Sequence, residues 1–288
     1  MTWEETIKFI RTQDEYKELV KKAYFEEDLA LNVERFQNEE EFAETLKILK
    51  AYQPKAEHIL DIGCGNGISS ISFALQGYKV AAVEPDPSPT IGAGAIRKLK
   101  ENYHLDNIEV YEAYAEDIHF NDESFDVVYV RQAMHHANDL DKFIAEAGRV
   151  LKKGGLLITV RDHVIFDLKD KAWFLEMHPL HKFYGGENAF TTEEYKNAMF
   201  KAGLKVEKEL KYYDSVINYF PLTETDFKKR REVIIEDRKK SLDRKIGVFS
   251  NIGVLFNLYD KLLDIRNGSA FDEKNNPGRM YSYIAIKK

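Results

Sequence analysis

The sequence predicts an α/β fold with a doubly wound sheet, in which parallel strands alternate with helical crossovers. Between residues 58 and 160, short β-rich runs alternate with segments of helical periodicity. The first run ends in a glycine-rich turn, "DIGCGNG" at residues 61–67, where a ligand can approach the main chain closely. In sheets of this kind, ligands bind at the loops that follow the carboxyl ends of the strands.

Helices are expected before the sheet. Apolar side chains mostly three or four positions apart predict helix over residues 3–27, with one polar break. A second helix is predicted from Asn38, as an N-cap with Glu41 three residues later, to about Tyr52. Residues 1–53 are therefore expected to form an N-terminal helical cap.

The alternating elements fill a predicted core of residues 54–162. The expected strands are residues 58–62, 79–83, 108–112, 125–130 and 155–160. The expected helices are residues 67–76, 90–103 and 139–152. This order is typical of parallel strands joined by helical crossovers.

The rest of the chain departs from this repeat. Residues 163–212 are expected to form a lid, with "HPLHKFYGG" at 178–186 as its possible moving part, then a helix near 192–202 and a strand at 204–212. Residues 213–278 form a predicted helical insertion, and residues 279–288 a closing strand. Inside the insertion, residues 246–265 have one apolar face, which we expect to be buried or to form a homodimer contact.

Composition narrows the class of protein. The chain has 288 residues, of which 44% are hydrophobic and 32% charged, as in ordinary globular proteins. A net charge of -7 disfavours nucleic acid as a partner, since a phosphate backbone favours clustered positive charge. The single cysteine excludes an internal disulfide and a cysteine-cluster metal site. With a charged N-terminus and no apolar run of membrane-spanning length, a cytoplasmic protein is expected.

A basic cluster at residues 228–240 is the best sequence argument for an anionic partner. Glu232, Glu236 and Asp237 interrupt it at helical spacing. This pattern favours a solvated helix face with internal ion pairs.

The spacing of the glycine turn limits what it can hold. Gly63, Gly65 and Gly67 follow Asp61 as GxGxG, and Ile68 stands where a dinucleotide fingerprint has its third glycine. No Gly-Lys-Ser/Thr follows, so the turn is not a Walker loop. Tight packing alone would also explain a glycine triplet.

Carboxylates at the ends of the next strands favour a nucleoside. Glu84 ends the second predicted strand, where a carboxylate accepts hydrogen bonds from ribose hydroxyls. Glu116 or Asp117 follows the third strand and would accept from the exocyclic amine of adenine.

Four stretches together resemble the class I S-adenosylmethionine-dependent methyltransferases: "ILDIGCGNGISSISFA", "VAAVEPD", "AYAEDIHF" and "FDVVYVRQAMHHANDLDKFIAEAGRVLKKGGLLITVRD". The resemblance covers about residues 58–162 and is strongest to the ubiquinone/menaquinone methyltransferase branch. It implies a Rossmann-like, mostly parallel seven-stranded sheet, with S-adenosylmethionine as the cofactor and S-adenosylhomocysteine as its product.

The resemblance also implies which residues bind the cofactor. The loop around the methionine and ribose parts is matched by Asp61, Gly63, Cys64 and Gly65. The ribose-binding acid is matched by Glu84, and its adenine-packing neighbour by Pro85. The adenine-edge pair is matched by Ala115 and Glu116, and the strand end that faces the transferred methyl by Arg131 and Gln132. Tyr114 stands where relatives often have Asp or Asn, so Glu116 is the expected adenine contact.

Histidines near the expected methyl-transfer centre are candidates for a general base. His135 and His136 follow the fourth strand, and Asp162 and His163 end the fifth. Structural roles are equally open: one histidine packing on the sheet, the other capping a helix, and Asp162 and His163 forming a hydrogen-bonded pair. We expect no metal, because the metal-binding acid cluster of the catechol-type enzymes is missing from the sequence.

The predicted function is methyl transfer to a small molecule, with an O, N or C nucleophile. The alternatives are an RNA or protein methyltransferase of the same fold and a non-catalytic nucleoside-binding module. A nicotinamide-dependent oxidoreductase is disfavoured by the GxGxG spacing.

Overall fold

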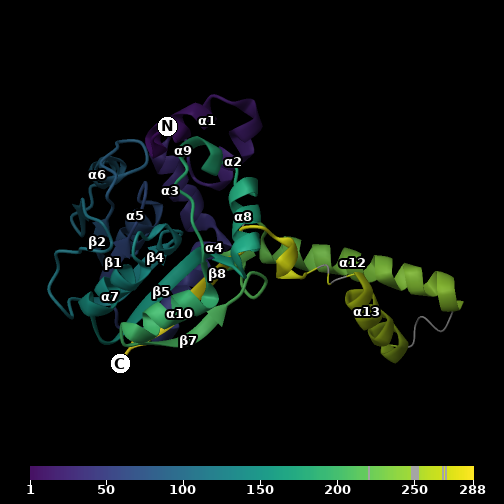
Figure 1. Cartoon of the computed structure of the whole chain (residues 1–288). Helices are drawn as coiled ribbons and strands as arrows, with labels where there is room; N and C mark the ends of the chain where they lie inside the picture. Colours follow the sequence, from purple (N-terminus) through teal and green to yellow (C-terminus); the bar gives the residue numbers. More distant parts are fainter. Residues whose placement is uncertain (220, 248–252, 268, 270) are drawn as a thin grey trace. The chain divides into compact units, whose positions relative to one another are not determined.

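The computed structural model describes residues 1–219, 221–247, 253–267, 269 and 271–288 (Figure 1). Residue contacts divide the chain into two compact units. The first unit is Met1–Asn218 together with Pro277–Lys288, and the second is Tyr219–Asn276. The predicted boundaries of cap, core and lid all fall inside the first unit and stay predictions.

The first unit is built on one sheet. Its strands are β1 (His58–Ile62), β2 (Lys79–Val83), β3 (Ile108–Tyr111), β4 (Phe125–Arg131), β5 (Leu151–Ile165), β6 (Phe190–Thr191), β7 (Leu204–Leu210) and β8 (Met280–Lys287). Seven of them follow the order β3-β2-β1-β4-β5-β8-β7, and β6 pairs with the end of β5. Only β8 runs antiparallel to its neighbours among the described strands. The predicted mostly parallel, seven-stranded sheet is confirmed.

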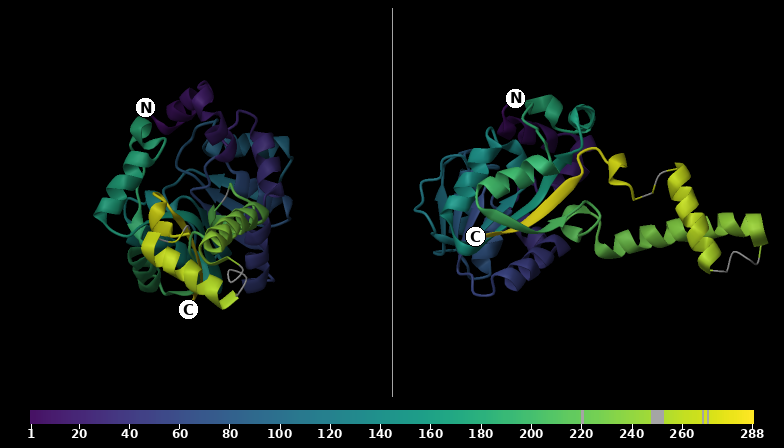
Figure 2. Two further views of the ribbon diagram at one scale, coloured as in Figure 1. Left: turned by 90° about the vertical axis from the view of Figure 1, so that its right-hand side faces the viewer. Right: turned by 60° about the horizontal axis from the view of Figure 1, so that its bottom comes forward.

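Helices cover both faces of the sheet, as Figure 2 shows. On one face, Val128 and Val130 of β4 pack in a cluster with side chains of α7 and α10. On the other face, the ring of Tyr129 lies 5.0 Å from that of Phe73 in α5. This alternation along one strand is what a sheet buried on both sides requires. The helices concerned are α5 (Ile68–Leu75), α6 (Ala93–Asn102), α7 (Leu140–Val150) and α10 (Thr192–Lys201).

The fifth strand is longer than predicted. Residues 155–160 were the expected span, but β5 covers Leu151–Ile165. Its last part pairs with β8 beyond a register shift, where Arg161 has a φ of 62°. The extension brings Asp162 and His163 into the strand itself, where they pair with Tyr281 and Met280 of β8.

The N-terminal helices differ from the prediction in their boundaries. Residues 3–27 form α1 (Trp3–Arg11), the short η1 (Asp14–Tyr16) and α2 (Lys17–Lys22), followed by α3 (Leu29–Asn38) and α4 (Glu40–Tyr52). Asn38 is not an N-cap: it is the last residue of α3, and its amide donates to the Glu34 carbonyl. The sequence analysis missed α3, which starts at the N-cap Asp28 and buries Val33 and Phe36.

We call residues 168–189 the lid segment, which holds α8 (Leu168–Met177) and α9 (His181–Tyr184). It packs on the N-terminal helices through aromatic rings. Trp3 lies 4.7 Å from Tyr184, and Phe9 lies 5.4 Å from Phe183, between ring centroids. The lid segment and the first helices therefore form one layer.

The second unit holds α12 (Glu224–Ile246), α13 (Gly253–Asn267) and η4 (Glu273–Asn275); the four-residue α11 (Val216–Tyr219) leads into it. Ion pairs occupy much of the basic cluster at 228–240. Lys228 pairs with Glu224 and Lys240 with Glu236, each one turn away, while Arg238 pairs with Asp260 and Asp264 of α13. The predicted ion-paired, solvated helix face is confirmed for Lys228 and Lys240, whereas Arg238 is mostly buried and joins α12 to α13.

The helix expected over residues 246–265 begins later than predicted. Ile246 is the last residue of α12, and α13 starts at Gly253. Phe249 and Ile252 of its expected apolar face lie outside the described residues. Several apolar side chains of α13 are exposed: Val254, Leu255, Leu258, Leu262 and Ile265. A homodimer contact through this segment stays a prediction. None of the helices in the described ranges has the length and apolarity needed to cross a membrane.

Candidate active site

The predicted site residues come together because parallel strands end at a common edge. Asp61 and the glycine turn follow β1, Glu84 follows β2, and Glu116 follows β3. Arg131 ends β4, and His163 lies near the end of β5. Since β1 is flanked by β2 and β4 in register, these groups line one edge of the sheet.

The glycines of the turn have different tasks. Gly63, Gly65 and Gly67 all have left-handed backbones, with φ of 66°, 54° and 82°. A Cβ on Gly63 would lie 2.5 Å from the Cβ of Ala133, so Gly63 lets the loops after β1 and β4 approach each other. A Cβ on Gly65 would meet no atom closer than 3.8 Å. A Cβ there would make only an ordinary contact with the Ile91 carbonyl oxygen, so packing alone does not require a glycine at this position.

Glu84 is the buried acid beside this turn. Its Oε2 accepts from the Gly65 N–H at 2.7 Å and its Oε1 from the Asp86 N–H at 3.0 Å. Burial raises the pKa of Glu84 to about 7, against the lowering effect of these two N–H donors. A carboxylate has about four acceptor positions, so room for two further donors remains. The two hydroxyls of a ribose fit this requirement, as S-adenosylmethionine would need.

Asp61 organises the start of α5. Its Oδ2 accepts from the hydroxyls of Ser69 and Ser70, both at 2.6 Å, and burial raises its pKa to about 6. Within the described ranges, its Oδ1 has no hydrogen-bond partner. Cys64 is buried as well, and burial raises the pKa of its thiol. The cysteine is therefore held as a neutral thiol in the loop.

The residues predicted to contact adenine lie at the expected edge of the sheet, but they differ in their burial and hydrogen bonds. Pro85 is exposed and Ala115 is half-buried. Glu116 accepts from the N–H of Asn138 at 2.9 Å and more weakly from that of Asp139. Glu116 thus fixes the loop that leads into α7, and its contact to adenine stays a prediction.

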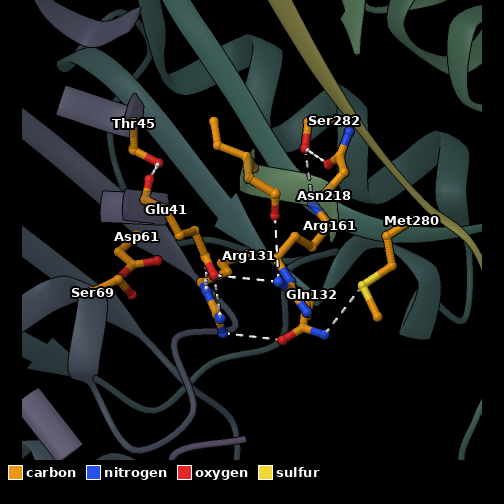
Figure 3. A network of polar contacts seen from close by, with 11 residues as sticks. Glu41, Thr45, Asp61, Ser69, Arg131, Gln132, Arg161, Asn218, Met280 and Ser282 are labelled. Atoms are coloured by element: carbon orange, nitrogen blue, oxygen red, sulfur yellow. Dashed lines mark hydrogen bonds and ion pairs between the residues drawn. The ribbon is translucent and has the colours of Figure 1, made fainter. Parts of the chain in front are cut away.

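The side chain of Arg131 forms an ion pair with an acid of the N-terminal helices (Figure 3). Its guanidinium binds both oxygens of Glu41 in α4, at 2.6 and 3.1 Å. Arg161 approaches the same carboxylate at 3.5 Å. Gln132, with φ of 51°, accepts from Arg131 and donates to the sulfur of Met280. Contacts of Arg131 and Gln132 to the methionine part of the cofactor stay predictions.

Glu41 is a site residue that the sequence analysis did not identify. It was interpreted as part of a helix cap, whereas its side chain is fully buried between two arginines. No local pattern marks it, because its partners come from β4 and β5.

His135 lies in a buried cluster at the ends of β4 and β5. Its main-chain N–H and its Nδ1 both face Asp162 Oδ1, at 3.1 and 3.0 Å, and its Nε2 lies 3.6 Å from Glu187 Oε2. Burial alone lowers the pKa of His135, but Asp162 and Glu187 outweigh it and raise the pKa to about 9. With this pKa the His135 imidazole is positively charged at neutral pH.

The other predicted histidines surround His135. The ring of His163 is 4.7 Å away, with Nδ1 2.9 Å from the Gly278 carbonyl oxygen, and burial lowers its pKa. His136 is exposed, its ring lies 4.1 Å from that of His135 at a tilt of 40°, and its Nδ1 contacts the Gly186 carbonyl. General-base roles for these histidines stay predictions.

Two members of the cluster come from the lid segment. Glu187 was missed in the sequence, although it follows directly on the glycines of "HKFYGGEN". His178 was noted as part of the lid, and its Nε2 lies 3.6 Å from Glu187 Oε1. The lid thus supplies charged groups to the same edge of the sheet.

Comparison with known proteins identifies the core. Residues 60–159 match the family model described as a methyltransferase domain. The uncharacterized methyltransferase YcgJ of Bacillus subtilis is 32% identical over 136 residues, which is 46% of this chain and 52% of YcgJ. The crystal structure of YcgJ resembles the present one with a TM-score of 0.52 at 20% identity, over 85% of this chain and 97% of that chain.

Two further relatives have named activities. The thiol S-methyltransferase TMT1B of Rattus norvegicus is 32% identical over 142 residues, 48% of this chain and 57% of TMT1B. The ubiquinone/menaquinone biosynthesis C-methyltransferase UbiE of Vibrio parahaemolyticus is 32% identical over 108 residues, 36% of this chain and 40% of UbiE. The chain thus spans about half the length of the curated relatives it matches. Residues 60–159 are thus similar to methyltransferase domains, in agreement with the expected class I type.

Proposed function

We propose that this protein transfers a methyl group from S-adenosylmethionine to a small-molecule acceptor. The observation that carries the proposal is the buried carboxylate of Glu84, which accepts from the Gly65 N–H of the glycine turn. This pairing offers a carboxylate for the ribose beside the loop that we expect to hold the methionine part. The named activities of TMT1B and UbiE, on a thiol and on quinone precursors, support a small acceptor.

The layer over the sheet edge supports the same acceptor class. The amide of Asn66, in the glycine turn, donates to the Tyr24 carbonyl at 2.7 Å, and Thr90 donates to Glu4 of α1. The N-terminal helices therefore bind the cofactor loops directly. An enclosed edge excludes water and suits a small acceptor better than a polymer.

The chemistry needs little dedicated machinery. S-adenosylmethionine supplies an activated methyl whose C–S bond breaks as the bond to the acceptor forms, leaving the electron pair on a neutral sulfur. The chain's residues then have two tasks: to align the partners in the closed edge, and to take up a proton where the acceptor carries one. The histidines at the ends of β4 and β5 lie beside the expected position of the acceptor.

Calorimetry with S-adenosylhomocysteine tests the proposal. We expect one site per chain, and Glu84→Ala should weaken binding by about 1–3 kcal/mol because ribose hydroxyls lose a buried acceptor. The matched control is Glu101→Ala, an exposed acid of α6. Binding of NAD in place of both S-adenosyl compounds would overturn the assignment.

The acceptor class needs a separate experiment. The protein is incubated with methyl-labelled S-adenosylmethionine and, in parallel, with a small-molecule extract, total RNA or a protein lysate. Labelled small molecules are the expected product, read by mass spectrometry. Label only in RNA or protein would favour the same fold with a macromolecular substrate, and cofactor binding without transfer to any pool would favour a non-catalytic module.

A further inference from the structure

The lid and the sheet edge together build a buried set of metal-binding groups. His135, His163 and Glu187 each place a ligand atom within 4.8 Å of the other two. The side chains of His135 and Glu187 are 2% and 6% exposed. Two imidazoles and one carboxylate are a ligand set typical of zinc and non-haem iron sites.

Hydrogen bonds fix both imidazoles in a ligating orientation. His135 presents Nδ1 to the Asp162 carboxylate at 3.0 Å, and His163 presents Nδ1 to the Gly278 carbonyl at 2.9 Å. With Nδ1 facing these acceptors, Nε2 is the atom of each ring left to bind a metal in the neutral form. Metal-binding histidines are usually held in this way, by a carboxylate or a carbonyl behind the ring.

The spacing inside the cluster fits a shared ion better than a hydrogen bond. His135 Nε2 and Glu187 Oε2 are 3.6 Å apart, beyond the 2.7–3.2 Å of an N–H···O bond. Two ligands at about 2.0–2.2 Å from one tetrahedral ion lie about 3.4 Å apart. In the described part of the chain, Glu187 Oε2 has no hydrogen-bond partner, while Oε1 accepts from Tyr184.

Charge balance points the same way. Asp162 and Glu187 are both buried carboxylates, and histidines are their ion-pair partners among the residues that the structure describes. The two carboxylates bring two negative charges into a site with little access to water, and a divalent cation would balance both.

We propose that His135, His163 and Glu187 bind one divalent transition-metal ion, of the zinc or ferrous class, between the sheet edge and the lid segment. Three protein ligands leave a position open, as in catalytic sites. His178, 3.6 Å from the other oxygen of Glu187, lies next to the site. No metal was expected from the sequence, because the ligands come from three separate segments.

The position of the site suggests what the ion does. It lies at the ends of β4 and β5, where the proposed function places the methyl acceptor. The open position would bind an oxygen, nitrogen or sulfur atom of the acceptor, favouring its deprotonated form. This role rests on the proposed function, whereas metal binding itself does not.

Metal binding is tested on the full chain after removal of any affinity tag and treatment with a chelator. Zn²⁺ is titrated by calorimetry, and Co²⁺ by visible absorption, whose intensity distinguishes four-coordinate from six-coordinate ions. We expect one equivalent of each, with cobalt absorption typical of four or five ligands. Absence of stoichiometric binding of both ions to the wild-type protein would overturn the proposal.

Variants assign the ligands. Glu187→Gln and His163→Gln should each weaken Zn²⁺ binding at least about 100-fold, beyond the loss typical of removing a group behind a ligand. Matched controls are Glu176→Gln and His119→Gln, which change exposed side chains outside the cluster. Unchanged affinity in both ligand variants, checked for folding by circular dichroism, would also overturn it.

S-adenosylhomocysteine binding separates this proposal from the proposed function. It is measured on the same metal-free sample. If the protein binds S-adenosylhomocysteine but does not bind the metal ions, only the metal proposal fails. If it binds the metal ions but not S-adenosylhomocysteine, only the methyltransferase assignment fails.

Discussion

At the scale of single residues, similar amino acids have different physical roles in this site. Gly63 and Gly65 share a left-handed backbone, but a Cβ on Gly63 would clash with Ala133, whereas a Cβ on Gly65 would make only an ordinary contact with the Ile91 carbonyl oxygen. Packing therefore excludes a side chain at position 63 and does not exclude one at position 65. The spacing of glycines in a sequence predicts a turn, and their neighbours decide whether it serves packing or binding.

The packing role of Gly63 can be tested by its stability. Gly63→Ala should lower the free energy of unfolding by about 2–5 kcal/mol, because a strained φ adds to a clash with Ala133. Gly154→Ala is the control, since Gly154 also has a left-handed φ, of 73°, but a Cβ there meets nothing within 4 Å. It should lose only about 1–2 kcal/mol. Urea unfolding measures both, and equal losses would argue against the clash.

Glu84 should make cofactor binding depend on pH. Its pKa of about 7 means that the carboxyl is mostly neutral at pH 6 and mostly ionised at pH 8. Ribose hydroxyls donate to the ionised form, so binding lowers this pKa and releases a proton. The affinity for S-adenosylhomocysteine should therefore rise about tenfold from pH 6 to pH 8.

Calorimetry at several pH values checks this dependence. The Glu84→Gln variant cannot ionise and should bind weakly with a nearly flat pH profile. The same slope in wild type and variant would show that another group is responsible.

At the scale of secondary-structure elements, a buried ion network joins α4 to β4 and β5. Glu41 pairs with Arg131 and Arg161, and Thr45 Oγ1 donates to the Glu41 carbonyl one turn earlier (Figure 3). Periodicity predicted α4 as a helix, since Phe42, Ile48 and Leu49 repeat on one face. It could not show that an acid on the same face binds two strands, because that pairing spans about 90–120 residues.

Removing this carboxylate should be costly. Glu41→Gln leaves two buried guanidinium groups without their counter-charge, so the free energy of unfolding should fall by about 3–5 kcal/mol. Glu44→Gln is the control on the same helix, because Glu44 pairs only with the exposed Lys47. That variant should change stability by less than about 1 kcal/mol. A loss at Glu41 no larger than at Glu44 would contradict the structural role of the network.

At the scale of the whole molecule, the predicted cofactor and catalytic residues all belong to the first compact unit. The second unit contributes α12 and α13, whose ion pairs link the two helices to each other. The methyltransferase-domain match at residues 60–159 also lies wholly in the first unit. We therefore expect cofactor binding to need no residue of the second unit.

This separation gives a prediction for a shortened chain. Replacing residues 219–276 by a Gly/Ser linker of about ten residues should leave S-adenosylhomocysteine affinity within about threefold of wild type, because β8 can still pair with β5 and β7. Calorimetry gives the affinity, and circular dichroism verifies the fold. Loss of binding by a folded shortened chain would show that the second unit supports the site.

Local patterns determined much of this protein. The strand runs at 58–62 and 79–83 match β1 and β2, and the carboxyl-end positions of Asp61, Glu84 and His135 follow from the order of parallel strands. These features depend on residues close together in the chain, where periodicity and turn chemistry act. The sequence by itself therefore determined the fold class and the strand ends at which the predicted cofactor residues lie.

Only the tertiary structure decided what those residues contact. Glu41 forms an ion pair with Arg131, and Glu187 of the lid segment lies beside His135. The ring of His163 contacts the carbonyl oxygen of Gly278. Each pair joins segments that are far apart in the sequence. Burial then shifts the pKa values of buried groups at the site away from those of exposed side chains. Long-range packing and desolvation leave no periodic trace in the sequence, so the acceptor end of the site emerged only from the fold.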